Sequence, residues 1–249
     1  RPYMPGDDPM HVDWKAFARS DKLFIKEFED ETNTQIDILV DISGSMGYSS
    51  ITHSKLEYAL FLASSLAYLS VRQRDAVGLT LFDNEIRRRL PAKSTKRHLH
   101  AMLREMERAE IGESTLMRKA LHELAEQRKR RGFVILISDM LGDAEGLVEG
   151  LKHFRFNGHE VILFQLLDPQ ELGFDFTDVI EFEDLETGQT KIIDADSAKE
   201  LYEQNLTKHQ DVLKKNCGLL GVDLSTLSTD QPLDFALFNY LAARSGREK

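Results

Sequence analysis

The chain has 249 residues, a formal net charge of −10 at pH 7 and a single cysteine. The negative charge argues against a general nucleic-acid binder, which needs a basic face to release counterions from the phosphates. One cysteine excludes an internal disulfide framework and fits a reducing cytoplasm, and the longest apolar stretch is too short to span a bilayer. These properties predict a soluble globular protein of the cytoplasm.

The first 33 residues differ from the rest of the chain. They open with RPYMPGDD, which has no signal-peptide character, and because the chain does not begin with Met we expect residues to precede it. A loop rich in Pro, Gly and Asp is followed by KLFIKEFEDE, which is predicted to form a strand at a sheet edge that its charges protect. We expect Trp14 to pack this arm onto the sheet and Asp13 and Arg19 to tie its loops, the alternative being a functional patch.

Residues 34–249 alternate apolar runs with helical patterns, which is typical of a mainly parallel sheet with helices on both faces. Ser54 and Glu57 form a capping-box pattern at the start of the first helix. The predicted strands are 36–40, 76–82, 133–138, 161–167 and 222–227, with a hairpin at 179–183 and 190–193. The further predicted helices are 96–108, 116–130, 144–156, 197–216 and 233–244. This order predicts one doubly wound, Rossmann-like domain over residues 34–249.

Polar side chains follow two of the buried strands, where ligands gather in open α/β sheets. The stretch DISGSMGYSS places Asp41, Ser43 and Ser45 after the first strand. Ser138 and Asp139 end a later strand, and Ser114 and Thr115 precede a helix. Two acids and several hydroxyls from three loops are therefore expected to meet at one end of the sheet.

Four kinds of functional site could use a turn of this composition. The turn lacks the first glycine that a nucleophile elbow needs, and it lacks the lysine of a phosphate-binding loop. An aspartyl-phosphate enzyme needs a second acid two residues after Asp41, where the chain has Ser43. A hard divalent cation fits, because Mg²⁺ takes carboxylate and hydroxyl oxygens. The remaining alternative is that Asp41 caps the next helix and the serines are turn formers.

At these residues the chain resembles the metal-ion-dependent adhesion site of von Willebrand factor type A domains. That pattern is Asp-x-Ser-x-Ser, then Thr, then Asp, and it matches Asp41, Ser43, Ser45, Thr115 and Asp139. The resemblance implies that the hydroxyls contact Mg²⁺, with Mn²⁺ or Ca²⁺ as alternatives, and that the acids bind it directly or through water. It also implies an open coordination position for a carboxylate from a protein partner. Because hydroxyl-rich Mg²⁺ sites bind weakly, we expect that the purified protein can have this site empty.

A narrower resemblance rests on three stretches, YMPGDDPMHVDWKAFARSDKLFIKEFEDETN, LAYLSVRQRDAVGL and LISDM. They are similar to a bacterial family of unknown function with a von Willebrand factor A-like domain, commonly encoded beside MoxR-type AAA+ ATPases. This resemblance implies a cytoplasmic adaptor that binds such an ATPase or its client in protein maturation or stress response. Met140 and Leu141 depart from the Asp-Gly pair of the wider family, so the local shape of this loop is expected to differ.

Two functions follow. The first is a Mg²⁺-dependent protein-interaction module without catalytic residues. The second is a metal-dependent, phosphatase-like hydrolase that uses Asp41 and Asp139. The sequence shows no second acid beside Asp41 and no histidine near the strand ends to serve as a general base, which favours binding.

Overall fold

The computed structural model describes residues 12, 14–20, 22–24, 34–112, 117–128, 130–142, 144–185, 187–235 and 237–238. The chain divides into two compact units, Arg1–Thr32 and Asn33–Lys249. In the first unit, α1 spans Trp14–Ser20, and Trp14, 61% exposed, sets its ring edge against Phe17. Asp13 and most of the predicted edge strand lie outside the described residues, so the expectations for this arm stay predictions.

The second unit is built on a six-stranded sheet. Its strands are β1 (Gln35–Asp41), β2 (Ala76–Phe82), β3 (Ile86–Lys93), β4 (Phe133–Ser138), β5 (Glu160–Leu167) and β8 (Asp223–Ser228). They lie in the order β3-β2-β1-β4-β5-β8, and all neighbours are parallel except β2 and β3. The five predicted strands are confirmed. β3 was not predicted, because its sequence IRRRLPAK carries the charges and the proline of an exposed edge strand.

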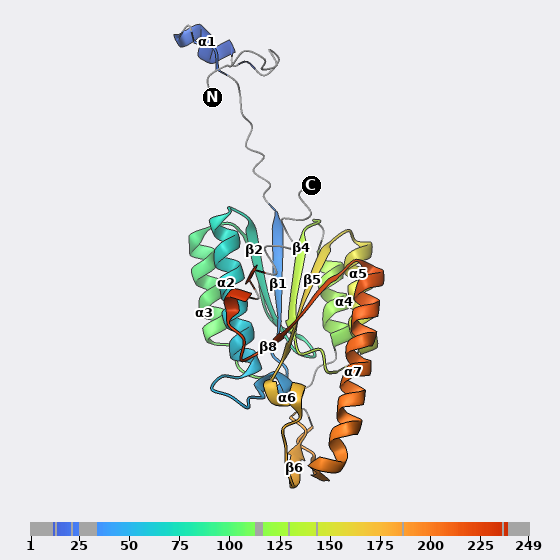
Figure 1. Ribbon diagram of the computed structural model, residues 1–249. Helices are drawn as coiled ribbons and strands as arrows, with labels where there is room; N and C mark the ends of the chain where they lie inside the picture. Colours follow the sequence, from blue (N-terminus) through green and yellow to red (C-terminus); the bar gives the residue numbers. More distant parts are fainter. Residues whose placement is uncertain are drawn as a thin grey trace. The chain divides into compact units, whose positions relative to one another are not determined.

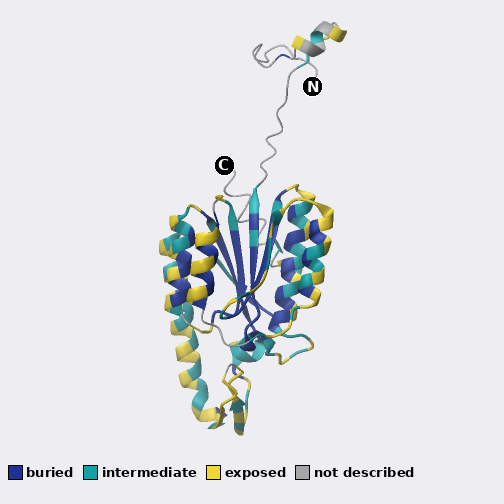
Figure 2. Ribbon diagram, turned by 180° about the vertical axis from the view of Figure 1, so that it is seen from behind, coloured by how far each residue is buried: buried dark blue, intermediate teal, exposed yellow. Residues whose placement is uncertain are grey.

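Helices cover both faces of this sheet, as Figure 1 shows. On one side lie α2 (Lys55–Arg72) and α3 (Lys96–Glu107); on the other lie α4 (Met117–Gln127), α5 (Ala144–Phe156) and α7 (Ala195–Leu220). Side chains of β1 alternate between the two cores: Ile38 and Val40 pack with α2 and α3, and Leu39 packs with α4. The central strands β1, β2, β4 and β5 are therefore buried on both faces (Figure 2), and the doubly wound α/β fold is confirmed.

A capping box fixes the start of α2, as predicted. The Ser54 hydroxyl accepts a hydrogen bond from the Glu57 backbone N–H at 3.1 Å, and the Glu57 carboxylate accepts one from the Ser54 N–H at 2.8 Å. Two backbone donors at the helix terminus are thereby satisfied. The cap also determines the place of Lys55, the first residue of the helix.

We expect Ser54→Ala to lower the free energy of unfolding by about 1 kcal/mol, because it removes the acceptor for the Glu57 N–H. Ser54→Gly is the matched control, since glycine at this position loses only a few tenths of a kcal/mol. Urea unfolding followed by circular dichroism measures both. Equal losses in the two variants would contradict a capping role for the hydroxyl.

A small subdomain follows β5 and extends beyond the carboxyl ends of the strands (Figure 1). It comprises α6 (Pro169–Gly173) and a hairpin of β6 (Val179–Glu183) and β7 (Thr190–Asp194). The predicted hairpin is confirmed. α7 begins there and runs back along the sheet, and its first half is largely exposed (Figure 2). Of the predicted last helix, the structure describes only its first residues, and none of the described helices is both long and apolar enough to cross a membrane.

Candidate functional site

The sheet has a topological switch point between β1 and β4. From β1 the chain moves outward to β2, whereas β4 leads to β5 and β8 on the other side. Ligands of open α/β sheets bind in the crevice at such a point, outside the carboxyl ends of the strands. Asp41 is the last residue of β1, Ser138 is the last residue of β4, and Asp139 follows directly. Both acids therefore stand at the switch point.

The turn after β1 brings two hydroxyls together. The Ser43 N–H donates to Asp41 Oδ1 at 2.9 Å and fixes the first residues of the turn. A short 3₁₀ helix, Gly44–Gly47, then places Ser45 Oγ 3.2 Å from Ser43 Oγ. Gly47 permits the close approach of Ile111, since a Cβ at this position would lie 2.5 Å from Ile111 Cδ1.

Asp41 is fully buried at the bottom of this turn. Its Oδ2 accepts a hydrogen bond of 2.7 Å from the Ser138 hydroxyl. Burial, and then the charge of Asp139, raise the pKa of Asp41 to about 7, while hydrogen bonds from Ser138 and Ser43 act in the opposite direction. These hydrogen bonds therefore offset only part of the cost of ionising the buried carboxyl.

A buried lysine lies on the other side of the site. Lys55 has no exposed surface, and its Nζ lies 2.8 Å from Asp139 Oδ2 and 2.5 Å from Glu171 Oε1. Burial alone would lower the pKa of Lys55, but the two carboxylates outweigh it and the pKa is raised. Burial raises the pKa of Glu171 despite the opposing charge of Lys55. The ammonium therefore neutralises part of the acidic charge of the site.

The sequence analysis did not identify Lys55 or Glu171 as site residues. Lys55 precedes Ala59 by four residues and Leu62 by seven, so it lies on the buried stripe of α2. A charged residue at a stripe position is a signal that was available. Glu171 gave no such signal, because it is the third residue of α6, a five-residue helix that no apolar pattern predicts.

The loop after β4 has a strained backbone. Met140 has a φ of 57°, in the left-handed region that favours glycine, and its side chain is buried. Its N–H donates to Ser138 Oγ at 3.0 Å, and its carbonyl lies 2.6 Å from His209 Nε2 on α7. These bonds hold the residue next to Asp139 in a conformation that a methionine rarely adopts.

Thr115, the remaining predicted ligand, lies outside the described residues, as does Ser114. The structure describes the chain up to Gly112 and again from Met117. The Gly112 N–H donates to the Ile42 carbonyl at 2.6 Å, next to the Asp41 turn, and α4 begins at the buried Met117. Gly112 also lies against the buried Asp83, since a Cβ there would be 2.3 Å from Asp83 Oδ2. The role of Thr115 stays a prediction.

The oxygen atoms of the described site residues fit the coordination geometry and the charge of Mg²⁺. Neighbouring ligands of an octahedral ion with bonds of about 2.1 Å are about 3 Å apart. The 3.2 Å between Ser43 Oγ and Ser45 Oγ is close to that separation, and Asp41 and Asp139 supply negative charge nearby. Within the described ranges, no group of three His, Cys, Asp or Glu side chains could hold a metal, so an ion here would rely on the hydroxyls.

Comparison with solved structures defines the class of fold. BatB from Bacteroides thetaiotaomicron superposes with a TM-score of 0.56 at 16% identity, covering 86% of this chain and 99% of BatB. The SpRpn10 VWA domain gives a TM-score of 0.51 at 12% identity, over 83% of this chain and 94% of that domain. The second unit therefore has a von Willebrand factor A-like fold.

The family model described as "Protein of unknown function DUF58" matches residues 1–212, and the chain belongs to this family. Uncharacterized proteins of Mycobacterium tuberculosis and Mycobacterium bovis are 24% identical to it over 250 residues. Those alignments cover 98% of this chain and 78% of each relative. The expected membership in a von Willebrand A-like family of unknown function is confirmed.

Proposed function

We propose that this protein is a Mg²⁺-dependent protein-interaction module that binds a carboxylate of its partner at the switch point. Ser43, Ser45 and Thr115 would contact the ion, and Asp41 and Asp139 would bind it directly or through water. The ion would supply an electrophilic position for the partner's carboxylate. We further propose that the partner is a MoxR-type AAA+ ATPase or its client, and that the protein is a cytoplasmic adaptor in protein maturation or stress response.

One observation carries this proposal: two hydroxyl oxygens lie 3.2 Å apart beside two acids at the switch point of a von Willebrand A-like sheet. Ser45 is partly exposed, whereas Asp41 and Ser43 are buried. An ion held there would be accessible to solvent on the side of Ser45. The acids would neutralise it from behind, which leaves its outer side for a ligand from another protein.

A metal-dependent hydrolase is the second candidate, because a carboxyl with a pKa of about 7 suits acid–base chemistry at neutral pH. Asp41 has no exposed surface, however, and its two oxygens already accept hydrogen bonds from Ser43 and Ser138. A buried carboxylate in this position can balance a charge but cannot reach a substrate. Turnover of generic phosphoesters with Mg²⁺ would revive this candidate.

The test of the interaction module is binding of a purified MoxR-type ATPase by the parent protein and by Asp41→Ala and Ser45→Ala. Such an ATPase needs Mg²⁺ with its own nucleotide, so variants at constant Mg²⁺ are more informative than chelation. We expect each variant to bind the ATPase at least about tenfold more weakly, because one buried charge or one metal ligand is lost.

Glu145→Ala, an exposed carboxylate in the first turn of α5, is the control and should bind like the parent. Calorimetry with Mg²⁺ alone shows whether the variants have lost the ion. If both variants bind the ATPase as tightly as the parent does, the metal-dependent interface is wrong. Loss of Mg²⁺ binding without loss of ATPase binding would place the partner surface elsewhere.

A further inference from the structure

A pocket of about 400 Å³ lies directly beside the proposed metal site. Ser45, one of the proposed ligands, belongs to its wall, as do Leu141 and Gly142 of the loop after β4. The opposite wall comes from α6, the β6–β7 hairpin and the first half of α7. The proposed metal function uses none of the residues in that second wall.

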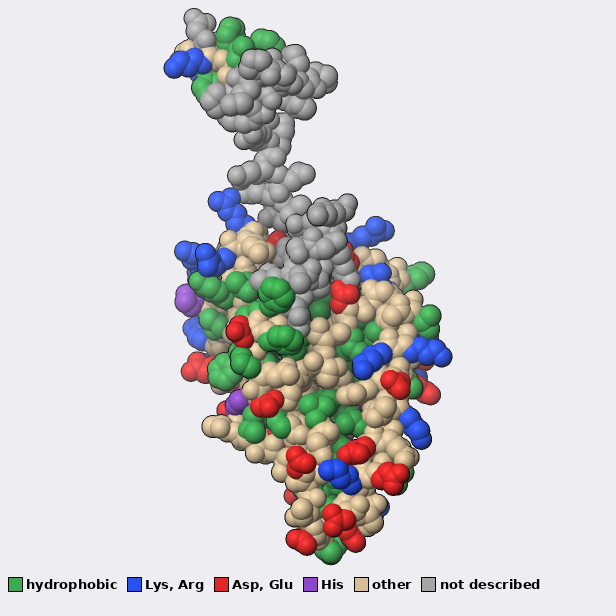
Figure 3. All heavy atoms as spheres, viewed as in Figure 1, with side chains coloured by type: hydrophobic (Ala, Val, Ile, Leu, Met, Phe, Trp, Pro, Cys, Tyr) green, Lys and Arg blue, Asp and Glu red, His purple; other side chains and the backbone are tan. Residues whose placement is uncertain are grey.

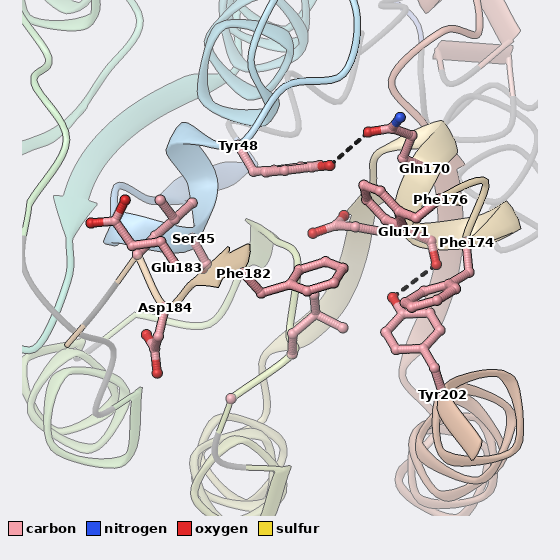
Figure 4. A pocket seen from close by; sticks show the side chains of 13 residues that line it. Ser45, Tyr48, Gln170, Glu171, Phe174, Phe176, Phe182, Glu183, Asp184 and Tyr202 are labelled. Atoms are coloured by element: carbon pink, nitrogen blue, oxygen red, sulfur yellow. Dashed lines mark hydrogen bonds between the residues drawn. The ribbon is translucent and has the colours of Figure 1, made fainter. Parts of the chain in front are cut away.

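Aromatic rings form this second wall. The ring centroids of Phe174 and Tyr202 are 4.6 Å apart, and Phe176 is 5.2 Å from Phe174 and 5.1 Å from Phe182. Figure 4 shows Phe174, Phe176 and Tyr202 gathered on one side of the pocket. The packing of these rings against each other gives the pocket a stable, mainly apolar surface.

Two hydrogen bonds fix the polar ends of the tyrosines. Tyr202 Oη donates to the Glu171 carbonyl at 2.9 Å, and Tyr48 Oη donates to Gln170 Oε1 at 2.9 Å (Figure 4). Both bonds run to α6, so the short helix connects the two walls. The pocket is therefore held open by contacts among residues that are distant in the sequence.

Acidic residues are part of the lining of the pocket. Glu183 and Asp184 are exposed residues of its lining, and Glu171, which also lines the pocket, forms an ion pair with Lys55. Of the lining residues that the structure describes, three are acidic and none is basic. Figure 3 shows acidic side chains gathered over this end of the molecule. The opening therefore repels anions and attracts cations.

We infer that this pocket binds an arginine or lysine side chain of the partner protein. The aliphatic stem would contact the rings, and the cationic group would lie against aromatic faces beside Glu183 and Asp184. Arginine fits best, because its planar guanidinium stacks on aromatic rings and can donate hydrogen bonds to more than one carboxylate. This inference extends the proposed function by defining a second anchor next to the metal-bound carboxylate, but the pocket itself needs no metal.

The probes that test it are N-acetyl-arginine amide and N-acetyl-norleucine amide, which has a neutral, apolar side chain. Binding to the full chain is followed by the ¹H–¹⁵N NMR signals of Gly142 and Leu185, which line opposite sides of the pocket. We expect the arginine probe to shift both signals with millimolar affinity, and the norleucine probe to bind at least about threefold more weakly.

The test variant is the double substitution Glu183→Gln and Asp184→Asn, which leaves the rings in place. It should weaken binding of the arginine probe about fivefold, because two nearby charges are removed. The control variant, Glu123→Gln with Glu126→Gln, removes the same charge from exposed positions on α4 and should bind like the parent. Phe182→Leu should also weaken binding, since it removes one ring.

The outcomes separate this inference from the metal proposal. If norleucine amide binds as tightly as arginine amide, or if neither probe shifts the two signals, the cation pocket is wrong. Equal binding by the parent and the Glu183/Asp184 variant would also overturn it. Binding of arginine amide to Asp41→Ala at parental strength supports the pocket even where that variant has lost Mg²⁺.

Discussion

Lys55→Met is expected to lower the free energy of unfolding by about 3–5 kcal/mol at pH 7. The substitution keeps an unbranched side chain of similar length at a position without exposed surface. It removes the ammonium from Asp139, 2.8 Å away, and from Glu171, 2.5 Å away. Two buried or half-buried carboxylates are then left without the cation, and their desolvation is no longer compensated.

The double variant Lys55→Met and Glu171→Gln should recover part of this loss, because it leaves one uncompensated carboxylate instead of two. Lys152→Met, on the exposed face of α5, is the matched control and should change stability by less than about 0.5 kcal/mol. Urea unfolding measures all three variants. A Lys55→Met protein as stable as the parent would show that the ammonium does not compensate these acids.

The same variant also reports on the metal. If the site takes Mg²⁺, the ion should stabilise Lys55→Met more than it stabilises the parent, because it replaces the missing positive charge. Unfolding curves with Mg²⁺ and with EDTA give the gain in unfolding free energy that the ion produces in each protein. Equal increments would mean that the lysine and the ion do not share the charge of Asp139.

Asp41→Asn should make the fold more stable at pH 8 in the absence of metal, although it removes a proposed ligand. The pKa of an aspartate is about 3.9 in an unfolded chain, whereas that of Asp41 in the fold is about 7. Between these values the folded protein holds a proton that the unfolded chain has lost. The contribution of this group to stability is therefore full below about pH 4 and decreases as the pH rises to 7.

The asparagine does not titrate, so the variant should avoid this decrease. Between pH 4 and pH 8 in EDTA, we expect the free energy of unfolding of Asp41→Asn to rise by roughly 2–4 kcal/mol relative to that of the parent. This difference should change with pH only below pH 7. Asp211→Asn on the exposed side of α7 should follow the parent curve. Parallel curves for Asp41→Asn and the parent would refute the buried, proton-binding state of this carboxyl.

Much of the fold could be predicted because β1, β2, β4 and β5 are short apolar runs, which strands buried on both faces require. β3 could not, since its charges lie on an exposed edge. The positions of Asp41 and Asp139 followed from strand ends alone, because parallel strands share one carboxyl edge. Lys55 joins partners 84 and 116 residues away, and no local pattern shows such pairs.

The long helix α7 connects the aromatic pocket to the loop that carries Asp139. Tyr202 bonds to α6, and His209, seven residues and about two turns further along, contacts the Met140 carbonyl. One continuous helix thus carries both contacts. We expect a guest that displaces α7 at Tyr202 to alter the His209–Met140 contact as well, and with it the backbone next to Asp139.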